Sequence, residues 1–302
     1  MKYKTPSALE MAVKEEARKS PVDTGRAISG FFFHRFLCRV FSSSEYGFVL
    51  KGGQSMLART IDARATRDID LLSRESTIDN ALEALRRAAS TDLDDFMRFE
   101  FSGTAPIKAD DEYRSGLNVV FIPWLGSKQL QPISIDLVVD EIPIEDAEVV
   151  TPADRLTIEG VESFDYLLYP IENALADKFC AIVERHGDRP SSRVKDLVDI
   201  AVYATTCSID GNKLATRLQK EAGARRMSLP ERFAVPEEWT GLYKKQFFKL
   251  HAQTGLPAEY RSIAESTKLA DRLFNPVLAG KIEGCKWQPT ELRWIEATSS
   301  SD

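Results

Sequence analysis

A pair of glycines followed closely by two alternating aspartates constrains this chain more than any other feature. Residues 51–55 read Lys-Gly-Gly-Gln-Ser, and residues 66–70 read Thr-Arg-Asp-Ile-Asp. Because a strand turns alternate side chains to the same face, Asp68 and Asp70 should project together while Ile69 points the other way. Neighbouring carboxylates repel each other unless a cation lies between them, and the hard-oxygen preference of Mg²⁺ or Mn²⁺ suits such a pair.

The glycine pair is suited to hold a polyphosphate. Gly52 and Gly53 follow residues 47–51, a short run that predicts a strand ending in a tight turn. Because glycine has no Cβ, the backbone N–H groups of such a turn can approach phosphate oxygens closely. The hydroxyl of Ser55 is nearby in sequence. Together with the aspartates, this turn predicts a site for a nucleoside triphosphate (NTP) and its divalent cation.

A third carboxylate belongs to another predicted strand. In residues 133–138 (Ile-Ser-Ile-Asp-Leu-Val) the isoleucines alternate with Ser134 and Asp136, as in a strand with one buried face. If this strand pairs with the strand of Asp68 and Asp70, Asp136 completes a three-carboxylate metal site and can accept a proton from an attacking hydroxyl. The spacing equally allows Asp136 to be a solvent-facing residue, and both interpretations stay open.

A second cluster of charges falls on two predicted helices, residues 171–186 and 192–206. Lys178 lies in the first helix among apolar neighbours, and Asp196 and Asp199 share one face of the second at spacing i, i+3. Lys178 is a candidate for binding the β- and γ-phosphates, and the aspartates are candidates to anchor it or to approach the metal. The alternative is an ordinary amphipathic helix pair joined by salt bridges, which the spacing alone favours.

The predicted secondary structure changes character near residue 152. Before it, predicted strands at residues 47–51, 67–72, 96–102, 117–123 and 133–139 are interspersed with helices, and beyond it the pattern is mostly helical. We expect an α+β fold, with a mixed sheet and helices in a nucleotidyltransferase-type domain at residues 1–152. Residues 153–302 are expected to form a helical C-terminal lobe that completes the active-site cleft.

Composition restricts the class of protein. The chain has 302 residues, 43% of them hydrophobic and 28% charged, which is enough for a sizeable core. It has no apolar run long enough to cross a bilayer and no signal-peptide core, so we expect a cytoplasmic protein with no membrane partner. Four scattered cysteines and three distant histidines support neither a zinc site nor a Ser-His-Asp triad.

Four sequence blocks resemble the AbiEii/AbiGii-type nucleotidyltransferase toxins, the family that includes the mycobacterial MenT toxins. In order, they are residues 52–57 (Gly-Gly-Gln-Ser-Met-Leu), residues 66–71 (Thr-Arg-Asp-Ile-Asp-Leu), Lys178 after Glu172, and residues 193–199 (Arg-Val-Lys-Asp-Leu-Val-Asp). The resemblance covers Lys51 to about Tyr203. It implies a polymerase-β-like nucleotidyltransferase fold, an NTP co-substrate with Mg²⁺ or Mn²⁺, and a toxin restrained by a cognate antitoxin. It also implies nucleotide addition to the 3′ end of tRNA, which blocks translation.

The same resemblance implies roles for individual residues. Asp68 and Asp70 would bind the metal, Lys178 would bind phosphate, and Asp196 would complete the essential set. The assignment of Asp136 as a metal ligand and proton acceptor depends instead on the alternation of its strand and on the general fold. The nucleotide-binding residues expected from the matched motifs are Gly52, Gly53, Ser55, Arg67 and Lys178.

The acceptor substrate is not fixed by any motif. The net charge of −6 argues against strong nonspecific nucleic-acid binding by the whole surface. A local basic groove remains compatible with it, because basic residues outnumber acidic ones in residues 205–250, where aromatic residues are interleaved. Two alternatives therefore stay open: a nucleotidyltransferase acting on a protein or a small hydroxyl compound, and a non-catalytic nucleotide-binding module that binds a partner protein.

Overall fold

The computed structural model divides the chain into two compact units. It describes residues 2–43, 45, 47–66, 68–107, 114–140, 146–185 and 190–297. Unit 1 consists of residues 1–61 and 65–169, and unit 2 consists of residues 62–64 and 170–302. Each unit has its own internal packing and is described on its own.

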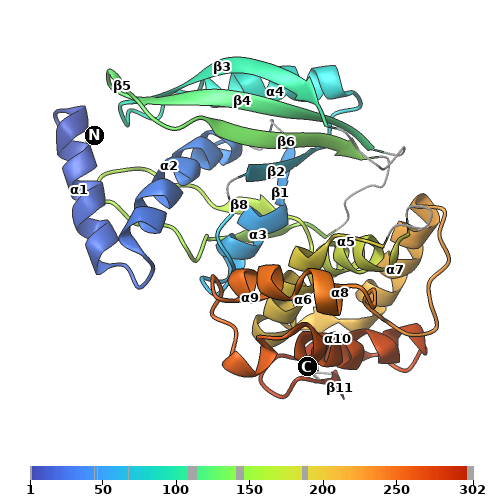
Figure 1. Ribbon diagram of the computed structural model, residues 1–302. Helices are drawn as coiled ribbons and strands as arrows, with labels where there is room; N and C mark the ends of the chain where they lie inside the picture. Colours follow the sequence, from blue (N-terminus) through green and yellow to red (C-terminus); the bar gives the residue numbers. More distant parts are fainter. Residues whose placement is uncertain are drawn as a thin grey trace, which may run out of the picture. The chain divides into compact units, whose positions relative to one another are not determined.

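Unit 1 is built around a mixed β-sheet (Figure 1). The strand order is β3-β4-β6-β2-β1-β8-β7, and β5 pairs with β4. The pairs β2–β6 and β1–β8 are parallel, whereas β1–β2, β3–β4, β4–β6 and β7–β8 are antiparallel. The elements of unit 1 are α1 (Pro6–Lys19), α2 (Thr24–Phe41), β1 (Phe48–Lys51), α3 (Gly52–Arg59), β2 (Asp68–Ser73), α4 (Ile78–Ala89), β3 (Met97–Pro106), β4 (Arg114–Leu125), β5 (Lys128–Gln129), β6 (Ile133–Asp140), β7 (Glu148–Val150) and β8 (Tyr166–Leu168).

Strand alternation separates a core face of this sheet from a face that carries polar residues. Ile69 and Leu71 of β2 lie beside Ile135 and Leu137 of β6, and all four side chains are buried. They belong to one hydrophobic core with residues of α1, α2 and α4. Helix α4 begins where the Thr77 hydroxyl accepts a hydrogen bond from a backbone N–H, as expected for an N-cap. The opposite face is therefore the one that carries Asp68, Asp70 and Asp136.

A buried charge cluster fixes α2 to the segment before β3. Asp95 is buried and accepts from Nε of Arg35 at 2.6 Å and from Nη2 of Arg39 at 2.7 Å. Arg39 also donates to the carbonyl oxygen of Met97 at 2.8 Å. Burial alone would raise the pKa of Asp95, but the two guanidinium groups hold it below its ordinary value. The cluster thus keeps two buried arginines in place through one carboxylate.

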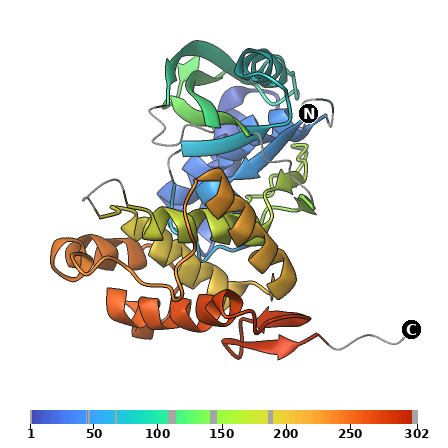
Figure 2. The same cartoon turned by 90° about the vertical axis from the view of Figure 1, so that its right-hand side faces the viewer.

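Unit 2 is mainly helical, with a small antiparallel sheet of order β11-β10-β9. Figure 2 shows the β10–β11 hairpin, in red, near the C-terminal end of the chain. Trp287 of β10 is fully buried and donates to the carbonyl oxygen of Ala204 at 2.7 Å. The elements of unit 2 are α5 (Ile171–Val183), α6 (Val194–Thr206), β9 (Ile209–Asp210), α7 (Gly211–Ala224), α8 (Trp239–Leu242), α9 (Lys244–His251), the 3₁₀ helix η2 (Ala258–Tyr260), α10 (Ile263–Leu278), β10 (Cys285–Gln288) and β11 (Arg293–Glu296).

The predicted α+β class, with a mixed sheet and a mostly helical C-terminal part, is confirmed. The predicted boundary after residue 152 differs from the division between the units, which falls after Tyr169. The reason is that β8 pairs with β1 and β7, so residues 153–169 belong to the sheet unit. The small sheet of unit 2 was not predicted. No helix within the described residues is long and apolar enough to span a bilayer.

Replacing Asp95 tests the buried charge cluster. We expect Asp95→Asn to lower the free energy of unfolding by about 3–5 kcal/mol, because it leaves two buried guanidinium groups without their carboxylate. Urea unfolding measures this change, and Glu100→Gln, at an exposed position of β3, is the control that should change stability by less than about 0.5 kcal/mol. Equal stability of the two variants would contradict the role given to Asp95.

Candidate active site

Four polar residues form a row across adjacent strands of the unit 1 sheet. Lys51 of β1 is opposite Asp70 of β2, Asp70 is beside Asp136 of β6, and Asp136 is opposite Asn118 of β4. Because directly paired residues project to the same face and neighbouring strands lie about 4.8 Å apart, the two carboxylates are adjacent. The condition stated for Asp136, that its strand lies beside the strand of Asp68 and Asp70, is therefore met.

Hydrogen bonds fix the orientation of Asp136. The amide of Asn118 donates to Oδ1 of Asp136 at 2.8 Å and to Oγ of Ser134 at 2.7 Å. Ser134 is in turn the register partner of Asp68, whose side chain is exposed. Asn118 was not among the predicted site residues. The signal for it was a single polar residue in the otherwise apolar run of residues 117–121 (Leu-Asn-Val-Val-Phe), within a strand that had already been predicted.

The glycine turn lies directly against this row. Gly52 has a φ of +64°, and a Cβ built on it would lie 1.8 Å from Oδ2 of Asp70. A Cβ on Gly53 would lie 2.9 Å from the Cβ of Thr66. Both positions therefore require glycine, for its left-handed backbone at Gly52 and for close approach at both. The turn opens α3, whose first N–H groups have no partner within the helix, as at any helix N-terminus.

The other residues predicted for this site are more buried than the aspartates or lie outside the described residues. Ser55 is buried at 2% exposure on α3, and Gly52 and Gly53 are half-buried. Arg67, predicted to bind nucleotide, lies outside the described residues. His34, which the metal and triad arguments had set aside, is packed inside unit 1 with Nδ1 2.8 Å from the Tyr166 hydroxyl. The exposed side of the site is therefore formed by Asp68 and the partly exposed Asp70 and Asp136.

The chemistry of these residues fits a divalent cation. Asp70 and Asp136 present hard carboxylate oxygens side by side, with Asp68 two residues before Asp70 on the same face. In the part of the chain that the structure describes, no three His, Cys, Asp or Glu side chains converge closely enough to form a ready-made metal cage. The predicted set of three carboxylates is therefore not assembled as a cluster among the described residues. Mg²⁺ generally takes only a few carboxylates, with phosphate oxygens and water as its other ligands.

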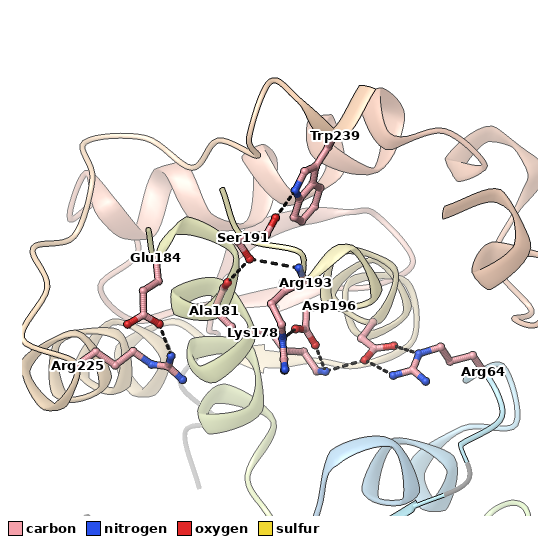
Figure 3. Close-up of polar contacts among 10 residues, drawn as sticks. Arg64, Lys178, Ala181, Glu184, Ser191, Arg193, Asp196, Arg225 and Trp239 are labelled. Carbon is pink, nitrogen blue, oxygen red and sulfur yellow. Dashed lines mark hydrogen bonds and ion pairs between the residues drawn. The ribbon is translucent and has the colours of Figure 1, made fainter. Parts of the chain in front are cut away.

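Lys178, Asp196 and Asp199 meet within unit 2. Nζ of Lys178 donates to Oδ1 of Asp196 at 2.9 Å and to Oδ2 of Asp199 at 2.7 Å. Arg193 binds the other oxygen of Asp196 at 2.6 Å, and Arg64 binds both oxygens of Asp199 at 2.9 and 3.1 Å. Figure 3 shows Arg193, Asp196, Lys178 and Arg64 in one continuous chain of contacts. These contacts agree both with aspartates that anchor Lys178 and with the alternative of a helix pair joined by salt bridges.

This unit 2 cluster is strongly ionised. Burial alone would lower the pKa of Lys178, but Asp196 and Asp199 raise it above its ordinary value. Burial alone would raise the pKa of Asp196, but Lys178 and Arg193 hold it well below its usual range. The side chains of Asp196 and Asp199 are each 1% exposed, and that of Lys178 is 12% exposed. Lys178 therefore carries its positive charge mainly against protein carboxylates.

The basic region at residues 205–250 contains both buried and exposed side chains. Arg217 and Arg225 each form an ion pair with Glu221, and Arg225 forms a second ion pair with Glu184. Among the aromatic residues, Phe233, Trp239 and Phe247 are buried, which is the packing alternative of the prediction. On α9 the exposed side chains include Lys244, Lys245, Phe248 and Lys249.

The pH dependence of stability should distinguish the contribution of Asp196 to the free energy of unfolding from that of an exposed carboxylate. We expect Asp196→Asn to lower the free energy of unfolding by about 3–5 kcal/mol near neutral pH. Because the folded pKa of Asp196 is depressed, this stabilisation is present above the unfolded value of about 3.9 and is lost as the pH falls below it. The difference in free energy of unfolding between wild type and Asp196→Asn should therefore be constant from about pH 8 to pH 5. It should become smaller below about pH 4.

Urea unfolding across this pH range measures the difference, with Glu237→Gln as an exposed control in the same unit. A difference that does not narrow in acid would contradict the ionised cluster.

Comparisons with known proteins identify the chain. The model of a family described as nucleotidyl transferase AbiEii toxin, type IV TA system, matches residues 35–275. Among solved structures, JHP933 from Helicobacter pylori is 17% identical with a TM-score of 0.42, covering 84% of this chain and 94% of that one. A putative nucleotidyltransferase from H. pylori is also 17% identical, with a TM-score of 0.42 and coverages of 84% and 96%.

MenT4, a nucleotidyltransferase toxin from Mycobacterium tuberculosis H37Rv, is 14% identical, with a TM-score of 0.49 and coverages of 90% and 98%. The comparison with curated proteins found no match. The family model spans most of the chain, and the resemblance of the four sequence blocks is thereby confirmed. The chain belongs to the AbiEii family of nucleotidyltransferase toxins of type IV toxin–antitoxin systems.

Proposed function

We propose that this toxin transfers a nucleotide from an NTP to the 3′ end of tRNA, blocks translation in this way, and is neutralised by a cognate antitoxin. The observation that carries the proposal is the pairing of Asp70 with Asp136 directly beside the Gly52 turn. This arrangement places acidic ligands for a divalent cation next to backbone N–H groups suited to phosphate. The family description supports the part of the proposal that makes this protein a toxin with an antitoxin partner.

The glycine turn, the three aspartates and Asn118 have distinct parts in this proposal. The first turn of α3 binds the triphosphate through the N–H groups at Gly52 and Gly53, where the helix N-terminus favours negative charge. Asp68, Asp70 and Asp136 would hold Mg²⁺ or Mn²⁺, which when bound neutralises charge on the phosphates and the leaving pyrophosphate. Asn118 keeps Asp136 oriented through its hydrogen bond to Oδ1.

The transfer itself is a displacement at the α-phosphorus. The oxygen of the acceptor 3′-hydroxyl forms a bond to this phosphorus, and the bond to the β-phosphate oxygen breaks, so pyrophosphate leaves with the electron pair. The proton of the hydroxyl goes to a carboxylate oxygen of Asp136, which acts as the general base. Oδ1 of Asp136 already accepts a hydrogen bond from Asn118, so Oδ2 is assigned this role.

The roles of Lys178 and Asp196 are proposed from the family motif. Lys178 would bind phosphate and Asp196 would complete the essential set, with Asp196 keeping the ammonium charged through its 2.9 Å contact. Arg67 and Ser55 are proposed as nucleotide-binding residues on the same ground. The acceptor is proposed to be RNA because exposed Lys244, Lys245 and Lys249 with Phe248 on α9 can bind phosphates and stack on a base.

Asparagine substitutions test the carboxylate site. Asp70→Asn and Asp136→Asn should each lower the rate of nucleotidyl transfer by about 100-fold or more, because a cation ligand or the general base is lost. The thermal unfolding midpoint should be equal or higher, because repulsion between the two carboxylates is relieved. Labelled NTP transfer and thermal unfolding measure the two effects, with Asp165→Asn, at an exposed position before β8, as control.

Full transfer activity in either variant, or in wild type with excess chelator, would overturn the assignment. A lower unfolding midpoint with unchanged transfer would make the pair structural.

Sequencing of tRNA 3′ ends identifies the acceptor. Expression of the wild type in a bacterium should stop growth and add nucleotides to tRNA 3′ ends, whereas Asp70→Asn should do neither. Incubation of the protein with each labelled NTP and total RNA, followed by separation of RNA from protein, gives the same answer in vitro. Unchanged tRNA ends with label on protein or on a small hydroxyl compound would replace tRNA with that acceptor. No label on any product would refute the enzyme activity.

A further inference from the structure

A cavity of about 750 Å³ in unit 1 opens beside the carboxylate row. Asp68 and Ser134 line it from the sheet, and Phe32 and Phe33 line it from α2. Gln54 and Leu57 line it from α3, the helix that the glycine turn begins. Its volume lies in the range of small-molecule sites. Its walls combine apolar side chains with polar and charged ones, among them Arg26, Asp68 and Asp154.

Gln54 is the residue in this cavity that points to a ligand. Its side chain is only 5% exposed, and within the part of the chain that the structure describes its carboxamide makes no hydrogen bond to protein. The Gln54 amide atoms are not among the fully buried N and O atoms that lack a partner in the described residues, so they face the cavity, where a ligand can reach them. A ligand that offers a donor and an acceptor side by side would satisfy both ends of the amide.

The cavity walls restrict the shape of that ligand. Phe32 and Phe33 are half-buried, so part of each ring faces open space. Apolar and aromatic walls favour a flat ring system, and a paired donor and acceptor along one edge is the hydrogen-bonding pattern of a nucleobase. The nearby Asp68 places such a ring next to the predicted reacting phosphate, as required for a base that is attached to it through ribose.

We propose that this cavity is a nucleobase pocket in which Gln54 reads the edge of the base while Phe32 and Phe33 pack against the ring. The inference rests on the proposed function, because it names the part of the nucleotide that this site selects. The base belongs either to the incoming NTP or to the terminal nucleotide of the acceptor, and these sources share the same chemistry. Gln54 is thus a specificity-determining residue.

Direct binding measurements test the pocket without requiring turnover. Equilibrium dialysis with Mg²⁺ gives the dissociation constants of the four NTPs and of inorganic tripolyphosphate for wild type and Gln54→Leu. Leucine has a similar size and fills the buried position without hydrogen bonds. Gln219→Leu, at an exposed position of α7 away from the α9 surface proposed to bind RNA, is the matched control. Thermal unfolding confirms that each variant is folded. If Gln54→Leu does not fold, Gln54→Met takes its place.

If the pocket holds the NTP base, wild type should prefer one or two NTPs, and Gln54→Leu should weaken their binding about tenfold or more while tripolyphosphate binds equally well. If it holds the acceptor base, NTP binding should not change. The KM for an RNA acceptor, or the choice of its terminal base, should then change by a similar factor. Gln219→Leu should behave as wild type in both measurements.

The pocket is refuted if a folded Gln54 variant keeps wild-type NTP preference and wild-type acceptor selection. It is also refuted if tripolyphosphate binding falls by as much as NTP binding, because Gln54 would then act on phosphate. Failure of the proposed function has a different signature, in which wild type transfers no label to RNA. In that case, base-dependent NTP affinity that is lost in Gln54→Leu supports the pocket, and affinity that is independent of the base overturns it.

Discussion

The parallel pairing of β2 with β6 is the constraint on which the site depends. In the observed register Asp70 is beside Asp136, while Ile69 and Leu71 meet Ile135 and Leu137 in the core. A slip of one residue would turn the acidic side chains of one strand into the core and its isoleucines to the other face, so burial of the apolar set fixes the register. The hydrophobic effect thus holds together two carboxylates that would otherwise repel each other.

Two kinds of buried charge serve different purposes in the molecule. Asp95 neutralises two buried arginines inside the core of unit 1. The Asp70–Asp136 pair is only partly buried and faces away from the core, as a site that binds charged ligands requires. In unit 2, Lys178 is held between Asp196 and Asp199, an arrangement that fixes its position and keeps it charged. A phosphate would there compete with ion pairs that are already formed.

The sequence predicted the strand faces and the glycine turn of this region well because their signals are local. Alternation in residues 68–71 and 133–137 identified the strand faces, and the glycine pair identified the turn. Asn118 could have been found as the single polar residue in the apolar run of residues 117–121. Arg64 could not, because its partner Asp199 is 135 residues away and the intervening chain gives no periodic signal. The small sheet of unit 2 escaped prediction for a similar reason: β9 has two residues, and its partner β10 lies beyond several helices.

The most direct test is a Mn²⁺ titration followed by electron paramagnetic resonance. Wild type, Asp70→Asn, Asp136→Asn and the double variant are compared in the presence of a non-hydrolysable NTP. If Asp70 and Asp136 share one ion, each single substitution should remove most of the Mn²⁺ affinity, and the double variant should lose little more than either single one. Wild-type Mn²⁺ affinity in either single variant, or effects that simply add, would contradict a shared cation site.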